Sequence, residues 1–195
     1  MDSTLIIIGG LLLGCLLALS WFAGSDAPYV PTKNSRIKKI LKLAGLKKGA
    51  EFWELGSGDG RVVLEAAKLG ATSYGVEQSW IRIFWSRYQT KKQALPTAHF
   101  IHGDIFSVIR LPRPFGARND GFWNANFVFI FLLPKGVGKL EPILKKNLKK
   151  GTKIITQTFH FKNWKPVKKI LITDQIPNTL LGTGKYEGDF RIYQV

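Results

Sequence analysis

The sequence predicts an α/β fold in which a mostly parallel sheet is covered by helices. Two observations predict it. From residue 51 onward, short apolar runs alternate with segments of helical spacing, which is typical of chains that build parallel sheets. Residues 126–133 form a continuous apolar run rich in aromatic residues, as expected for a strand buried on both faces. With 195 residues, 45% of them hydrophobic, the chain has room for one globular domain and an appendage.

The predicted elements follow one another in a regular order. Strands are expected at residues 51–55, 72–77, 99–101, 126–133, 153–159, 168–176 and 190–195. Helices are expected at residues 61–69, 79–94 and 136–148, the first two ending before Gly70 and Pro96. Residues 110–124 contain two prolines and two glycines and have no period, so they predict a long loop.

The first 24 residues differ in kind from the rest. Residues 5–23 carry no charge, and a helix of that length reaches about 28 Å, close to the thickness of a bilayer core. Residues 1–4 lack the positive charge of a signal peptide. We therefore expect residues 1–24 to form a retained transmembrane helix, rather than a cleaved signal or a buried helix. Every Lys and Arg follows it, so the positive-inside rule places a single-pass protein with its globular part on the cytoplasmic or mitochondrial matrix side.

Residues 25–49 are predicted to form a linker and a basic amphipathic helix. Ile37, Ile40 and Leu41 recur at helical spacing with lysines between them. The globular domain then occupies residues 50–195. The net charge of +16 favours an acidic partner, for which we expect an anionic lipid surface rather than nucleic acid.

Cysteine and histidine residues indicate neither a disulfide nor a metal site. The one cysteine, Cys15, lies in the apolar run, so no intrachain disulfide can form. His99, His102 and His160 are scattered and have no cysteine partners, and we expect no metal.

The stretch "ELGSGDGR" at residues 54–61 predicts a ligand site. Gly56, Gly58 and Gly60 lie where the first strand turns into a helix, and glycine allows positive φ and close approach of a ligand. A pyrophosphate site would favour the spacing G-x-G-x-x-G. Here Glu54 and Asp59 would repel phosphate but could hold an ammonium group, so the turn indicates a cationic or zwitterionic ligand.

Two further carboxylates extend this site along the sheet edge. Glu77 ends the second predicted strand, where a carboxylate can accept hydrogen bonds from both ribose hydroxyls. Asp104 ends the third, where it can accept from an adenine amino group. Ammonium, ribose and adenine together describe S-adenosylmethionine.

The motifs "ELGSGDGR", "YGVEQS" and "HGD" resemble those of the class I, seven-stranded methyltransferases. The likeness is closest to the membrane-anchored mitochondrial lysine methyltransferases of the ATP synthase c subunit and the adenine nucleotide translocase, and to their prokaryotic relatives. It extends to "PYVPT" at residues 28–32, "GVEQSWIRIFWSRY" at 75–88 and "FHFKNWKP" at 159–166. This resemblance implies a Rossmann-like sheet of seven strands with helices on both faces and an antiparallel last strand.

The resemblance also implies which residues bind S-adenosylmethionine. They are Glu54, Gly56, Gly58, Glu77 and Asp104, to which we add their neighbours Ser57, Asp59, Gln78 and Ile105. The segment "PYVPT" is implied to pack over the methionine end of the cofactor, beside a substrate channel.

The acceptor is expected to be an amine. Transfer to an amine needs a neutral nucleophile, positioning and desolvation, but no strong general base. The fourth strand runs into Phe131-Leu132-Leu133-Pro134, without the Asn/Asp-Pro-Pro-aromatic motif common in enzymes that act on amino-adenine or glutamine. Candidates for the channel are Tyr29, Phe131, Pro134, Phe159, Phe161 and Trp164, with no general base assigned.

We therefore predict a protein-lysine N-methyltransferase whose substrate is a membrane-associated protein. One alternative keeps the cofactor but changes the acceptor to a small molecule, a lipid or RNA. Another is a catalytically inactive, membrane-tethered module that binds the cofactor.

Overall fold

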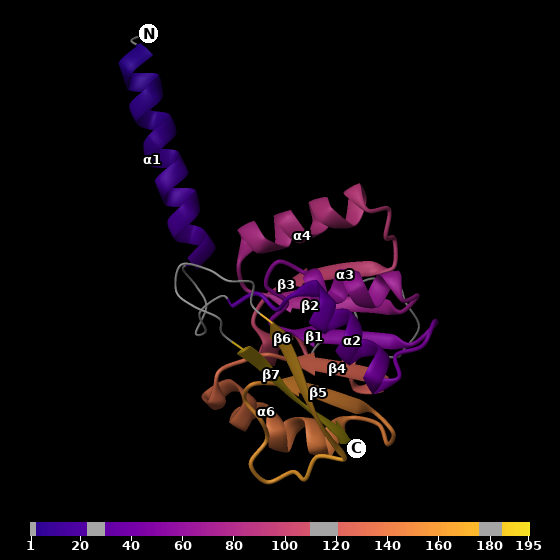
Figure 1. Ribbon diagram of the computed structural model, residues 1–195. Coiled ribbons are helices and arrows are strands. Elements are labelled where there is room, and N and C mark those ends of the chain that lie inside the picture. Colours follow the sequence, from indigo (N-terminus) through magenta and orange to yellow (C-terminus); the bar gives the residue numbers. More distant parts are fainter. Residues whose placement is uncertain (1–2, 23–29, 110–120, 176–184) are drawn as a thin grey trace.

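The computed structural model describes residues 3–22, 30–109, 121–175 and 185–195. Its centre is a seven-stranded sheet in the order β3-β2-β1-β4-β5-β7-β6 (Figure 1). The strands are β1 (Glu51–Leu55), β2 (Thr72–Glu77), β3 (Ala98–His102), β4 (Phe127–Ile130), β5 (Lys153–Gln157), β6 (Lys168–Gln175) and β7 (Lys185–Gln194). Strand β7 runs antiparallel to β5 and β6, and the other pairs are parallel. The predicted seven-stranded, mostly parallel sheet is confirmed.

Helices cover both faces of this sheet (Figure 1). The helices of the described chain are α1 (Ser3–Phe22), α2 (Asn34–Ala44), α3 (Arg61–Lys68), α4 (Trp80–Lys92), α5 (Ile105–Val108) and α6 (Pro134–Asn147), with the 3-10 helix η1 (Phe122–Asn124). Apolar residues of α2 and α3 pack against Phe52 and Phe129 on one face. Apolar residues of α6 pack against Trp53 and Val128 on the other. Because side chains alternate along a strand, Glu54 faces the same side as Phe52, toward α3.

Element boundaries differ from the predicted ones where a local feature overrides the pattern. The strand predicted at 153–159 ends at Gln157, because Thr158 has a φ of 62°, which no strand residue adopts. The strand predicted at 190–195 begins at Lys185. Helices α5 and η1 were not predicted, since one turn is too short to show a period. Of the predicted loop at 110–124, residues 110–120 lie outside the described residues.

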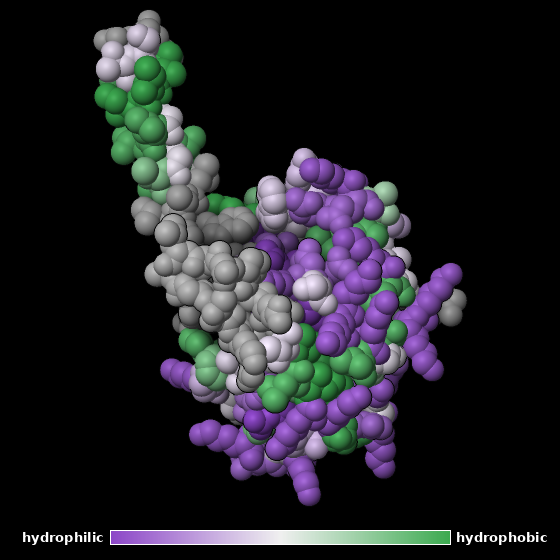
Figure 2. All heavy atoms as spheres, in the orientation of Figure 1, coloured by the Kyte–Doolittle hydropathy of each residue, from purple (hydrophilic) through white to green (hydrophobic). Residues whose placement is uncertain are grey.

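The prediction of a membrane anchor is wrong. No helix within the described part of the chain is long and apolar enough to cross a membrane. The expected transmembrane helix and single-pass localisation are therefore withdrawn. What the structure does describe is an exposed apolar helix beside a domain whose visible surface is largely hydrophilic (Figure 2).

Candidate functional site

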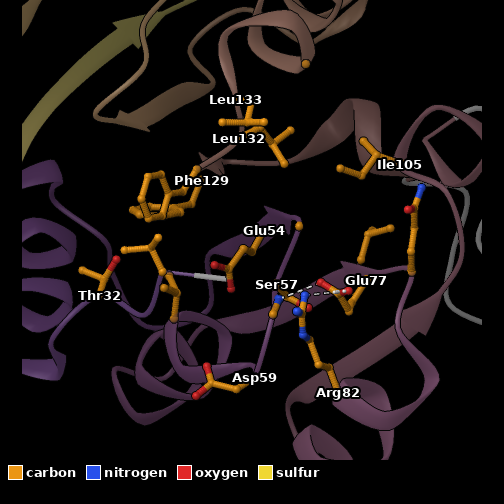
Figure 3. Close-up of a pocket in the computed structure, with 18 of the residues that line it drawn as sticks. Thr32, Glu54, Ser57, Asp59, Glu77, Arg82, Ile105, Phe129, Leu132 and Leu133 are labelled. Carbon is orange, nitrogen blue, oxygen red and sulfur yellow. Dashed lines mark hydrogen bonds and ion pairs between the residues drawn. The ribbon is translucent and has the colours of Figure 1, made fainter. Parts of the chain in front are cut away.

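A cavity of about 480 Å³ opens at the carboxyl ends of the parallel strands. Its walls come from the loop after β1, the end of β2, the start of α5, the segment between β4 and α6, and residues 30–32. This is the edge at which parallel α/β sheets bind ligands, and the volume suits a small molecule or cofactor. Figure 3 shows Glu54 and Phe129 on one side of this space and Ile105 on the other.

The loop after β1 depends on glycine at several positions. Gly56, Gly58 and Gly60 have φ angles of 87°, 54° and 80°, which glycine alone adopts without strain. A Cβ on Gly60 would lie 2.6 Å from the Phe100 ring, and one on Gly56 would lie 2.9 Å from Leu132. Close packing as well as backbone conformation therefore requires glycine here.

The Glu77 carboxylate fixes this loop to the end of β2. Its Oε2 accepts a hydrogen bond from the Gly58 amide at 2.9 Å, and its Oε1 accepts one from the Ser79 amide at 2.9 Å. Arg82 Nη1 lies 3.5 Å from the same Oε1, and both side chains are buried. The position predicted to bind ribose thus also holds the glycine loop in place (Figure 3).

Two buried oxygen atoms of the cavity wall have no hydrogen-bond partner within the described residues. They are Glu54 Oε2 and Ser57 Oγ. Burial raises the pKa of the Glu54 carboxyl well above its ordinary value, and the charges of Asp59 and Glu77 raise this pKa further. Because buried polar groups are nearly always hydrogen-bonded, these atoms fit a ligand that donates hydrogen bonds, preferably one with positive charge.

The Asp59 carboxylate is engaged within the protein. Arg61 meets it with two nitrogens, Nε at 2.9 Å from Oδ1 and Nη2 at 2.6 Å from Oδ2. Arg61 Nη1 also donates to the Thr32 carbonyl at 3.0 Å, and the Thr32 hydroxyl donates to Gln157 at 2.9 Å. Residues 30–32 are thus tied to the glycine loop on one side and to β5 on the other. Since Arg61 pairs directly with Asp59, the carboxylate oxygen of this loop region that is left for a cationic ligand, among the described residues, is that of Glu54.

Most of the predicted cofactor residues come together around the cavity. Its lining includes Glu54, Gly56, Ser57, Gly58, Asp59, Glu77, Gln78 and Ile105. Asp104 is outside this lining. Its Oδ1 caps α5 by accepting from the Ser107 amide at 3.0 Å, and its Oδ2 accepts from Gln78 at 3.1 Å.

Some of the predicted channel residues line the cavity and others do not. Phe131 and Phe159 line the cavity. Pro134 is the first residue of α6, between two residues that do so. Trp164 stacks on Phe161 with ring centroids 5.5 Å apart, and neither ring lines the cavity. Pro28 and Tyr29 lie outside the described residues, whereas residues 30–32 of the same segment line the cavity.

Sequence reasoning missed several residues of the cavity wall. These are Arg61, Arg82, Phe129 and Lys139. Arg61 stands at the end of the quoted motif "GDGR" and could have been considered as a partner for Asp59. Nothing in the sequence pattern indicates Arg82, because its pairing with Glu77 depends on how α4 packs.

The fold and the site define a class I, Rossmann-like methyltransferase: a sheet with an antiparallel β7 and a cavity over a glycine turn. Comparison with known proteins gives the particular family. Residues 54–168 match the ANTKMT methyltransferase domain, and the chain belongs to that family.

Two relatives show how far the similarity extends. The lysine N-methyltransferase of the ATP synthase c subunit from Homo sapiens is 29% identical over 140 residues, which cover 71% of this chain and 54% of that protein. This chain therefore spans about half the length of the human relative. The protein-lysine N-methyltransferase of Saccharolobus islandicus (strain REY15A) is 29% identical over 150 residues, which cover 75% of this chain and 86% of that protein.

A solved structure supports the cofactor. An RNA methyltransferase from Salinibacter ruber in complex with S-adenosyl-L-homocysteine has a TM-score of 0.67 and 25% identity, covering 85% of this chain and 94% of that one. The methyltransferase family uses S-adenosylmethionine. The unpartnered Glu54 and Ser57 atoms of the cavity fit its ammonium group and hydroxyls.

Proposed function

We propose that this protein transfers a methyl group from S-adenosylmethionine to the side-chain amine of a lysine in a protein substrate. The observation that carries the proposal is the composition of the cavity. One side holds a buried carboxylate and the glycine loop, and the other is built mainly from apolar side chains. Relatives named as lysine N-methyltransferases support the same acceptor.

Each half of the cavity has a different part in this proposal. Glu54 would accept from the cofactor ammonium group, while Glu77, which holds the loop, would also accept from the ribose hydroxyls. When bound, S-adenosylmethionine supplies a methyl group already activated on sulfur. The protein then has to position the amine and exclude water.

The apolar half suits a lysine that must attack as a neutral amine. Phe131, Leu132 and Phe159 belong to this wall. Removing an ammonium group from water lowers its pKa, so burial among these side chains favours the uncharged form. Lys135 and Lys139 also line the cavity, and their positive charge acts in the same direction.

We extend the proposal to a substrate that is a membrane-associated protein. The support is the human relative's name, which specifies the c subunit of ATP synthase, and the exposed apolar side chains of α1. Exposed lysines of α2 would suit an anionic surface beside such a substrate.

RNA is the second candidate acceptor. The similarity to the Salinibacter ruber RNA methyltransferase and the net charge of +16 favour it. The apolar residues that follow β4 argue against it, because they offer no polar side chain for the edge of a base.

A transfer assay with three acceptor classes tests the proposal. The purified full chain is incubated with methyl-labelled S-adenosylmethionine and, separately, with protein, total RNA and lipid from the same cells. We expect label in the protein fraction, and less of it in Glu54→Gln at a limiting concentration of the cofactor. Label in RNA or lipid alone would overturn the lysine assignment, and absence of label from all three would favour the inactive module.

A further inference from the structure

A strained turn follows β5 at the apolar end of the cavity. The Phe159 amide donates to the Gln157 carbonyl at 2.6 Å, which closes a three-residue turn around Thr158. Thr158 has a φ of 62° and is exposed. A turn of this kind costs free energy and persists only where the surroundings hold it. It directs the chain so that Phe159 lines the cavity.

His160 bridges the two strands beside this turn. Its Nδ1 lies 2.6 Å from the Thr156 hydroxyl on β5, and its Nε2 lies 2.8 Å from Asp189 Oδ2 on β7. The Asp189 carbonyl in turn accepts from the Thr158 amide at 2.9 Å. Arg191 Nη2 lies 3.4 Å from Asp189 Oδ2. The His160 imidazole thus connects Thr156, just before the turn, to Asp189, whose carbonyl binds the turn itself.

This group of side chains is placed to hold the turn rather than to perform chemistry. A hydroxyl, an imidazole and a carboxylate in series can activate a nucleophile. However, the Thr156 side chain is fully buried, and none of the three groups lines the cavity. Phe159, which is next in sequence to His160, connects the group to the apolar half of the cavity.

We propose that His160 is a positioning residue that holds the Thr158 turn and thereby sets the Phe159 ring in the acceptor half of the cavity. The inference rests on the proposed function, which assigns the apolar half of the cavity to the acceptor lysine. It assigns to His160 a role in placing the acceptor amine, with no direct contact to cofactor or acceptor.

A second side chain that holds the same loop, Glu141, provides a matched control. The buried Glu141 carboxylate of α6 accepts from the amides of Lys162 and Asn163, at 3.1 and 2.7 Å. It holds the loop three residues further on, where no residue lines the cavity. Glu141→Gln should therefore loosen residues 162–163 without moving Phe159.

Hydrogen exchange measured by mass spectrometry tests the proposal on the full chain. In His160→Ala, we expect exchange of the amides at 158–161 to rise about 10-fold, while those of Ile154 and Ile155 in β5 keep wild-type rates. In Glu141→Gln, the increase should be confined to 162–163. Thr158→Asn in the His160→Ala background should restore protection at 158–161, because Asn tolerates positive φ. Unchanged exchange at 158–161, or an equal rise throughout β5, would overturn the proposal.

Binding and transfer measurements complete the test. For His160→Ala, we expect the dissociation constant for S-adenosylmethionine to stay within twofold of wild type, while label transfer to the protein fraction falls at least 10-fold. A parallel loss of cofactor affinity would contradict a role confined to the acceptor half. Should the wild type fail to bind S-adenosylmethionine, the proposed function fails, and the exchange data still decide whether His160 holds the turn.

Discussion

Glu54 lies at the end of β1 with only 4% of its surface exposed, and within the described residues its Oε2 has no hydrogen-bond partner. A buried carboxylate of this kind lowers the stability of the fold when it is ionised. The same atom is available to a cationic ligand. We infer that this position is kept for binding at a cost in stability.

Replacing Glu54 with Gln should reveal this cost through its pH dependence. The folded-state pKa of Glu54 is raised, so its contribution to stability is fully present below its unfolded value near 4.5 and is lost as the pH rises through the folded value. Glu54→Gln removes that titration. We expect the stability of Glu54→Gln relative to wild type to rise with pH, reaching an excess of roughly 1–3 kcal/mol in the free energy of unfolding once the wild-type carboxyl is ionised, measured by urea denaturation.

The same variant should bind S-adenosylmethionine about 10-fold more weakly, a difference of about 1.4 kcal/mol. Glu65→Gln is the matched control, because Glu65 pairs with Lys68 at 2.7 Å on α3 and does not line the cavity. Equal affinities for Glu54→Gln and Glu65→Gln would exclude Glu54 from ammonium binding.

Gly75 on β2 controls the position of Ser57. A Cβ at Gly75 would lie 2.8 Å from both Cβ and Oγ of Ser57 and 2.9 Å from Val63. Gly75→Ala should therefore displace the glycine loop and weaken S-adenosylmethionine binding at least 5-fold, about 1 kcal/mol, by isothermal titration. Gly138→Ala on α6 is the control, since a Cβ there meets nothing within 4 Å. Wild-type affinity in Gly75→Ala would show that the loop adjusts without cost.

At the scale of elements, Arg61 connects the start of α3 to residues 30–32. Its paired contact with Asp59 leaves Nη1 directed at the Thr32 carbonyl. A lysine cannot reproduce this planar arrangement of donors. The position of residues 30–32 along the cavity wall therefore depends on a guanidinium group at residue 61.

Arg61→Lys should loosen residues 30–32 and weaken cofactor binding by about 10-fold, because hydrogen bonds to charged groups are lost. Protease cleavage in this segment should become faster, and binding by isothermal titration should confirm the change in affinity. Lys68→Arg on the same helix should have no effect on either measurement. If Arg61→Lys retains wild-type affinity and protease resistance, the segment is held by other contacts.

The sequence predicted the elements that have a strong period and missed those set by packing. Strands β1 and β2 have the predicted bounds because apolar runs end at clear turn residues. The end of β5 was missed because a strained turn at Thr158 leaves no mark in the pattern. In the site, carboxylates at strand ends were predicted, whereas the pairings of Arg61 and Arg82 depend on neighbours that sequence order does not place together.

At the scale of the whole molecule, the loss of folding stability at acid pH should depend in part on His160. Burial lowers its pKa below the ordinary 6.5, Arg191 and Lys169 lower it further, and Asp189 opposes the shift. The stability from the neutral ring is thus present above the unfolded value and is lost as the pH falls through the folded one. We expect the urea midpoint to fall more steeply between about pH 7.5 and pH 5 in wild type than in His160→Gln. Equal slopes would contradict this.

The chain as a whole combines a cofactor site with an apolar acceptor half and an exposed apolar helix at one end. The cofactor site follows from the family and the fold. The central claim is that the acceptor is a lysine side chain. Tandem mass spectrometry of protein substrates treated with S-adenosylmethionine carrying a trideuterated methyl group tests it most directly. We predict heavy methyl groups on lysine Nζ, dependent on the protein and reduced in Glu54→Gln at a limiting concentration of the cofactor. Heavy methyl groups found on other side chains but not on lysine would contradict the claim.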